Sequence, residues 1–143
     1  MPENGKDRTR FAEYVKLQAG DRGFLSRNDE KVLLQDGIAR FNVDYDEARW
    51  ILTGVAAEEQ VALERELDRT IAVVLARFAE SNDKITKDEF DDAVQIYRTL
   101  SKDGLLEKDV KKKLKTMVSD NKWHPARKGM MRSKRWYRRI DKL

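Results

Sequence analysis

Acidic side chains gather in two stretches whose residue order is typical of a calcium-binding helix–loop–helix: GDRGFLSRNDE, residues 20–30, and NDKITKDEFDD, residues 82–92. Calcium takes oxygen ligands from positions 1, 3, 5, 7, 9 and 12 of a twelve-residue loop. When Ile85 is aligned to the apolar position 8 of such a loop, Phe78 falls at position 1, where it offers no ligand. In the first stretch the same alignment puts Arg22 at position 5. Neither stretch therefore fits a standard calcium loop.

The same acids have another use, as caps of helix first turns. The chain holds three pairs of a capping residue and an acid three positions later: Ser26 with Asp29, Asp44 with Glu47, and Thr86 with Glu89. In such a pair the side chains satisfy backbone amides that have no partner within the helix. The pattern therefore predicts helices that begin after Ser26, Asp44 and Thr86.

Residues suited to catalysis are scarce. The chain has no cysteine, which excludes a disulfide framework, a thiolate zinc site and a cysteine nucleophile. Its one histidine, His124, cannot make a zinc site alone. Asp91 and Asp92 are adjacent in a predicted helix and face about 100° apart, so they do not form an acid/base pair. We expect a protein that is not an enzyme and has no cofactor.

The spacing of apolar residues predicts an all-α fold. Both prolines, Pro2 and Pro125, lie near the ends of the chain, so about 120 residues between them carry no helix-breaking ring. We predict six helices in a single domain: one that contains residues 11–15, three over about 26–40, 44–53 and 57–80, one after residue 86, and one after residue 106. The segment Leu25–Asn28 resembles Ile85–Asp88, which indicates two similar helical hairpins.

The stretches from Gly20 to Leu52 and from Asn82 to Leu100 resemble the tellurite-resistance TerB-like family, an all-helical domain. The resemblance covers about residues 9–118; residues 1–8 would be an N-terminal tail and 119–143 a basic, aromatic C-terminal segment. It implies a stress-associated or adaptor domain, in some members with bound metal. The acids that match the family's motif, and would be its metal ligands, are Asp21, Asp29, Glu30, Asp83, Asp88 and Glu89. Arg22 and Lys84 each place a cation beside one of these acids.

Charge is distributed unevenly along the chain. Residues 1–110 carry 17 Lys and Arg against 24 Asp and Glu, a net charge of −7, whereas residues 111–143 carry 13 against 2, a net charge of +11. The start of the chain lacks the apolar core of a signal peptide, and no apolar run approaches the roughly 18 residues that span a bilayer. We expect a cytoplasmic protein without a transmembrane segment.

The C-terminal segment mixes these cations with aromatic and apolar side chains. Trp136, Ile140 and Leu143 share one face of a predicted short helix. Such a segment can anchor in a groove of a protein partner, contact nucleic-acid phosphates, lie on an anionic membrane, or fold back on the acidic body. The candidate binding residues are Trp123, Arg127, Lys128, Arg132, Arg135, Trp136, Tyr137, Arg138, Arg139 and Ile140.

The function that we expect first is that of a non-enzymatic adaptor, which docks onto a larger protein assembly through an acidic or apolar groove of its partner. The alternatives are an accessory protein that binds nucleic acid through the same segment, and a metal-responsive stress protein of the TerB type.

Overall fold

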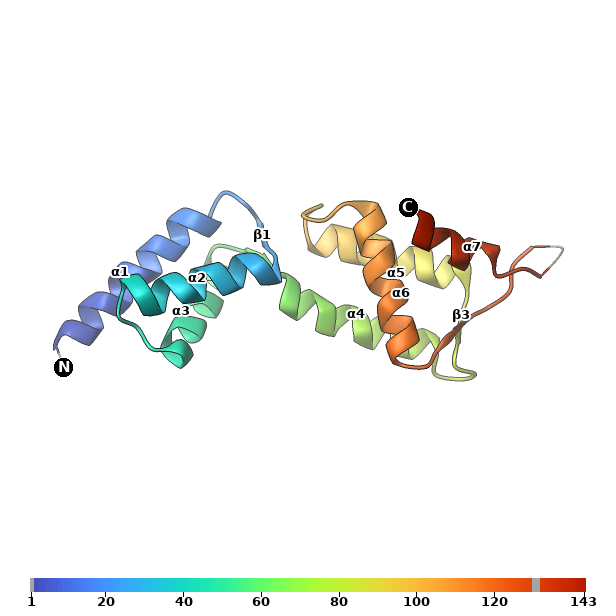
Figure 1. The fold of residues 1–143 in the computed structure, drawn as a ribbon, viewed down its shortest axis with the longest axis horizontal. Coiled ribbons are helices and arrows are strands. Elements are labelled where there is room, and N and C mark those ends of the chain that lie inside the picture. Colours follow the sequence, from blue (N-terminus) through green and yellow to red (C-terminus); the bar gives the residue numbers. More distant parts are fainter. Residues whose placement is uncertain (1, 130–131) are drawn as a thin grey trace. The chain divides into compact units, whose positions relative to one another are not determined.

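The computed structural model describes residues 2–129 and 132–143, with side chains from residue 5 onwards. Helices make up most of this part of the chain, and the strands are only two residues long (Figure 1). The predicted all-α fold is confirmed. The chain separates into two compact units, residues 1–66 and 67–143, where we expected one domain over residues 9–118. Each unit is described by itself below.

The first unit is built from two helix–loop–helix segments joined at their loops. Its elements are α1 (Pro2–Ala19), β1 (Phe24–Leu25), α2 (Arg27–Arg40), α3 (Tyr45–Glu58), β2 (Ala62–Leu63) and the first turn of α4 (Glu64–Phe78). Strands β1 and β2 pair in parallel, with Leu25 opposite Leu63. Both leucines are buried together with Phe11, Val15 and residues of α2 and α3. The loop pairing therefore lies at one edge of the first core.

The N-terminal residues belong to this unit, which corrects the expected tail over residues 1–8. Helix α1 begins at Pro2, and proline suits a first helical turn because that turn needs no amide donor. The Thr9 hydroxyl donates a hydrogen bond to the Gly5 carbonyl at 2.9 Å. Arg8 forms an ion pair with Glu47 of α3. Residues 2–8 thus extend the helix that packs on α3.

The predicted helix starts are confirmed by their caps. The Ser26 and Thr86 hydroxyls accept hydrogen bonds from the Asp29 and Glu89 amides, and both acids bond back to the amide of the capping residue. The Asp44 carboxylate accepts from the Glu47 amide at 2.9 Å. Local sequence therefore sets where these three helices begin.

The helix that we predicted over residues 57–80 is confirmed as α4, but its predicted start is wrong, because α3 continues to Glu58 and α4 begins only at Glu64. The Val61 amide donates to the Ala56 carbonyl at 2.8 Å, and the Gln60 amide donates to Ala57 at 3.3 Å. Gln60 has a φ of 56°, the left-handed conformation of this helix-ending motif. The chain then leaves the helix and forms β2.

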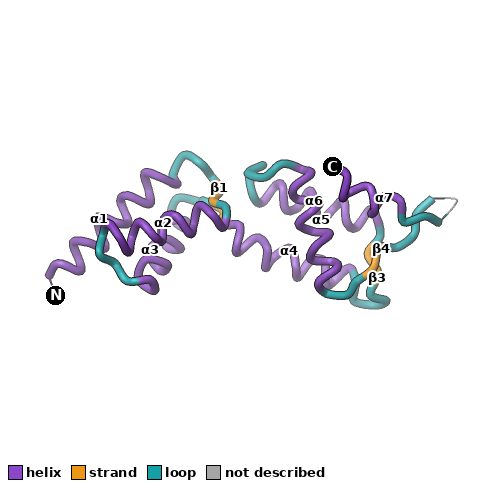
Figure 2. The backbone as a smooth tube through the Cα atoms, in the orientation of Figure 1, coloured by secondary structure: helices purple, strands orange, loops and turns teal. Residues whose placement is uncertain are grey.

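The second unit repeats this plan with the rest of α4, β3 (Lys84–Ile85), α5 (Lys87–Leu100), α6 (Glu107–Asp120), β4 (His124–Pro125), α7 (Arg135–Arg138) and the 3-10 helix η1 (Arg139–Lys142). Strands β3 and β4 pair in parallel (Figure 2). The His124 and Ala126 amides donate to the carbonyls of Asp83 and Ile85, each at 2.8 Å. Pro125 fits between them because alternate residues of a strand point their backbone groups away from the partner.

The C-terminal segment completes the core of the second unit, so the predicted boundary between residues 118 and 119 is not where the structure divides. Ile140 is only 4% exposed and lies in one cluster with Phe90, Val94 and Leu114. In Figure 1, α7 lies beside α5 and α6. Apolar side chains of α5 and α6 would otherwise face water, and α7 and η1 cover them.

A buried carboxylate joins the three long helices of the second unit. Asp68 of α4 accepts a hydrogen bond from the Tyr97 hydroxyl of α5 at 2.9 Å and from Lys113 of α6 at 3.1 Å. A buried carboxylate is stable only when it is paired and hydrogen-bonded in this way. The contact fixes the frame on which the C-terminal segment packs.

Two helical glycines of the first unit provide a matched test of its packing. A Cβ at Gly37 would lie 2.8 Å from the buried Phe11 ring, whereas a Cβ at Gly54 would meet nothing within 4 Å. Gly37→Ala should lower the free energy of unfolding by about 1–3 kcal/mol through overpacking. Gly54→Ala should raise it by about 0.5–1 kcal/mol, because alanine is the better helix former.

Urea denaturation followed by circular dichroism measures both changes. Equal effects of the two substitutions would contradict the described contact between α1 and α2.

Candidate functional site

Two of the three acids proposed as metal ligands in the first unit have other partners. Asp29 belongs to the capping box with Ser26 and also accepts a hydrogen bond from Arg22 at 2.9 Å. Burial alone would raise the pKa of Asp29, but the hydrogen bonds from Ser26 and Arg22 outweigh it and lower that pKa. Glu30 is buried against Arg65, with an oxygen–nitrogen distance of 3.0 Å. Asp21 is exposed on the loop before β1.

The acids proposed as metal ligands in the second unit also have other contacts. Glu89 caps α5 together with Thr86, and Asp88 pairs with Lys128 at 2.9 Å. Asp83 has a φ of 58° and uses its carbonyl to accept the His124 amide. Within the described residues, no three acids or histidines gather closely enough to hold a metal ion. In this unit Glu89 therefore caps a helix, Asp88 forms an ion pair and Asp83 takes part in the pairing of β3 with β4.

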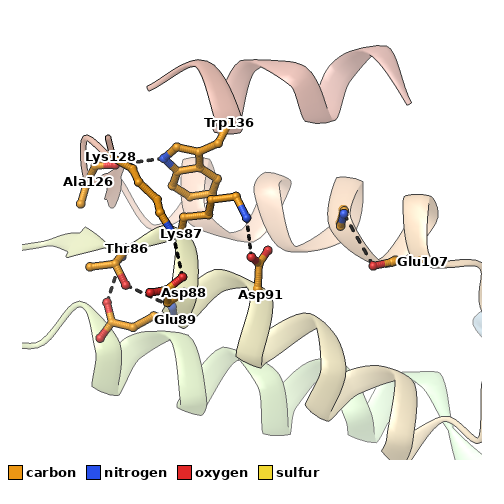
Figure 3. A network of polar contacts seen from close by, with 10 residues as sticks. Thr86, Lys87, Asp88, Glu89, Asp91, Glu107, Ala126, Lys128 and Trp136 are labelled. Carbon is orange, nitrogen blue, oxygen red and sulfur yellow. Dashed lines mark hydrogen bonds and ion pairs between the residues drawn. The ribbon is translucent and has the colours of Figure 1, made fainter. Parts of the chain in front are cut away.

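The ten candidate binding residues of the C-terminal segment divide into two groups. The first group is aromatic or apolar and packs inward: Trp123, Trp136, Tyr137 and Ile140 all lie in or against the second core. The Trp136 ring lies 5.6 Å from that of Phe90, and its indole Nε1 donates to the Ala126 carbonyl at 3.1 Å (Figure 3). These side chains face the chain's own helices, as in the fold-back alternative.

The second group is cationic and faces solvent: Arg127, Lys128, Arg132, Arg135, Arg138 and Arg139 are all exposed. Lys128 pairs with Asp88, but the five arginines have no carboxylate partner among the described residues. The segment is therefore amphipathic in three dimensions, with its apolar side packed in the second core and its charged side exposed.

Part of this cationic group surrounds a cavity. The cavity has a volume of about 480 Å³ and is lined by Lys84, Pro125, Ala126, Arg127, Arg132 and Lys134. Four of the six lining residues carry a positive charge, and none carries a negative one. None of these four cations forms an ion pair within the described part of the chain. An anion that entered would meet several donors at once.

Strand pairing and a closed loop bring these cations together. Lys84 stands opposite His124 in the β3–β4 register, which places it beside the start of the C-terminal segment. Downstream, Lys128 and Ser133 exchange two backbone hydrogen bonds of 2.9 Å each, which close the loop that carries Arg132. Sequence reasoning missed Lys84, because only the pairing of strands 40 residues apart reveals its position.

Lys128 of this loop also forms an ion pair with Asp88 of α5. Figure 3 shows Lys128 reaching to Asp88, next to the Thr86–Glu89 cap. The hydrogen bond and the charge of Lys128 lower the pKa of Asp88. Because that pKa is lowered, the contact is complete above the ordinary carboxyl range and is lost as the pH falls through the pKa of Asp88. At neutral pH the carboxylate of Asp88 is thus charged and can pair with Lys128 at the surface.

The packing of Trp136 makes a prediction about stability. Trp136→Ala should lower the free energy of unfolding by about 3 kcal/mol. It removes both the ring that packs on Phe90 and the indole N–H that donates a hydrogen bond to the Ala126 carbonyl. Trp50→Ala is the control, since that ring is 78% exposed and its loss should change stability by less than about 0.5 kcal/mol. Urea denaturation compares the two. Equal losses would contradict the packed position of Trp136.

The Lys128–Asp88 contact makes a second prediction. Lys128→Met should raise the pKa of Asp88 towards its ordinary value, because a neighbouring cation favours the carboxylate. An NMR titration of the side-chain carboxyl measures this directly. Lys122→Met, which removes an equally exposed cation elsewhere, should leave the pKa of Asp88 unchanged. The same response in both variants would show that the contact does not exist in solution.

Comparisons with known proteins give this surface no precedent. No family model, no curated protein and no solved structure matches the chain. The resemblance to the TerB-like family stays a prediction. Among the described residues, no helix combines the length and apolar character needed to cross a membrane.

Proposed function

We propose that this protein is a non-enzymatic accessory protein that binds nucleic acid through the cationic surface of its second unit. The observation that carries the proposal is the cavity lined by Lys84, Arg127, Arg132 and Lys134, which has no acidic residue in its wall. Arginine donates planar pairs of hydrogen bonds that match phosphate oxygens, and lysine adds point charges. The cavity's chemistry therefore suits a phosphate-bearing ligand.

The location of the apolar side chains favours nucleic acid over the other anionic partners. A protein groove would need Trp136 and Ile140 as anchors, and a membrane would need the same apolar face to enter the lipid. Both side chains pack within the second unit. A ligand that meets this surface from solution meets mainly charge, and the nucleic-acid backbone is a polyanion that charge alone can bind. Our first expectation, docking of the segment into a protein partner, would require these side chains to leave their core.

The net charge of each unit agrees with this assignment. Residues 67–143 carry 20 Lys and Arg against 12 Asp and Glu, a net charge of +8, whereas residues 1–66 carry 10 against 14, a net charge of −4. Positive charge on one unit attracts a polyanion and increases its association rate at low salt. The cation-rich unit is also the unit that holds the cavity.

The test is the binding of a fluorescently labelled single-stranded DNA oligonucleotide to the full chain over a salt series. The affinity should fall steeply as the salt concentration rises. The variant Arg127→Ala/Arg132→Ala/Lys134→Ala should bind more weakly, and its slope of log affinity against log salt should be shallower by about 2, because each phosphate contact contributes about 0.7.

A variant with the same change in net charge serves as the control. Arg69, Arg77 and Lys108 are exposed and lie outside the cavity, so replacing all three with alanine should weaken binding much less. Equal losses in the two triple variants would show that general charge, not the cavity, binds DNA. Absence of DNA binding, or preferred binding to vesicles of anionic lipid, would overturn the proposal.

A further inference from the structure

An exposed tryptophan distinguishes the surface of the first unit. Trp50 of α3 is 78% exposed, although its neighbours Ile51 and Leu52 are buried. A large exposed aromatic ring is the kind of side chain that serves as an anchor in protein interfaces. Nothing in the core of the first unit requires a ring at this position, because Trp50 lies outside the cluster that forms that core.

Two hollows flank this ring, both between α1 and α3. One has a volume of about 360 Å³ and is lined by residues that include Ala12, Lys16, Trp50, Ile51 and Gly54. The other has a volume of about 240 Å³ and shares Trp50 and Ile51 with the first. Both hollows are lined by the buried Ile51, and Trp50 stands exposed between them; we call the two hollows and this ring the α1–α3 groove.

Gly54 keeps the larger hollow open. The residue lies within α3, and a Cβ there would meet no atom within 4 Å. Glycine weakens a helix interior, and here neither a close contact nor a left-handed backbone requires it. Gly37 in α2 is different, since its Cβ would strike Phe11. The open space at Gly54 is therefore a feature of the groove and not of the core.

The charges at the groove are acidic. Its two cations are paired: Arg8 with Glu47 of α3, and Lys16 with Glu59, which directly follows α3. The other acids of the lining are Glu13, Asp46 and Glu58, and none of them forms an ion pair with a described residue. The groove thus combines the apolar side chains of Trp50 and Ile51 with acids that form no ion pair among the described residues.

We infer that the α1–α3 groove binds an amphipathic helix of a protein partner, with an apolar stripe placed on Trp50 and Ile51 and a basic polar face towards Glu13, Asp46 and Glu58. A helix laid in a groove is a common mode of peptide recognition. The acidic rim selects a basic helix, because like charges at an interface are unfavourable. This site lies in the first unit and does not depend on the nucleic-acid proposal.

The test measures fluorescence anisotropy of a labelled synthetic amphipathic helix with a leucine stripe and a lysine-rich polar face. The full chain should bind it, and should bind much more weakly a helix with the same stripe and glutamate in place of lysine. Trp50→Ala should weaken binding by about 30-fold or more, as expected when an interface anchor is removed. Gly54→Leu should weaken binding similarly, because its side chain starts in the open hollow, where a Cβ meets no atom within 4 Å.

The matched control is Leu17→Ala, which removes another exposed apolar side chain of the first unit, 81% exposed and outside the groove lining. It should leave binding unchanged. No binding of the basic helix, or binding that Trp50→Ala and Gly54→Leu leave intact, would overturn the inference. So would a chain that self-associates in sedimentation through Trp50, since the occupant would then be a second copy of the chain.

Discussion

The pairing of loops is the constraint on which the rest of the structure depends. The loop after each of α1, α3, α4 and α6 contains a strand of two residues with a buried residue, and that residue stands opposite a counterpart from the next loop of its unit: Leu25 with Leu63, and Ile85 with Pro125. A strand this short has few hydrogen bonds, so burial of the paired side chains supplies much of its stability. The pairing sets where α3 must end and where the C-terminal segment must start.

The features of the fold that could be predicted from the sequence are those set by interactions between residues close together in the chain. The helix starts at Ser26, Asp44 and Thr86 were predictable, because each cap lies within four residues of the amide that it satisfies. The break at Gln60 was not, because the left-handed position carries neither glycine nor asparagine. Lys122 has a φ of 60° and ends α6 in the same unmarked way.

The sequence predicted which types of residue the candidate site contains, but not how they are arranged. The basic and aromatic character of the C-terminal segment identified its residues, but the sequence could not show which of them face inward. Trp136 and Arg135 are neighbours in the chain, yet one packs on Phe90 and the other is exposed. Lys84 joins the cavity only through strand register. Contacts between residues far apart in sequence thus turned an apparent docking segment into a structural element with a charged outer side.

Pro125 has a consequence for how the molecule meets other copies of itself. The outer side of β4 has no strand partner among the described residues, and an unpaired edge can be a template for pairing with another strand. At the position that points outward, proline has no amide hydrogen to offer. The edge therefore cannot be extended at this residue, which also lines the cationic cavity.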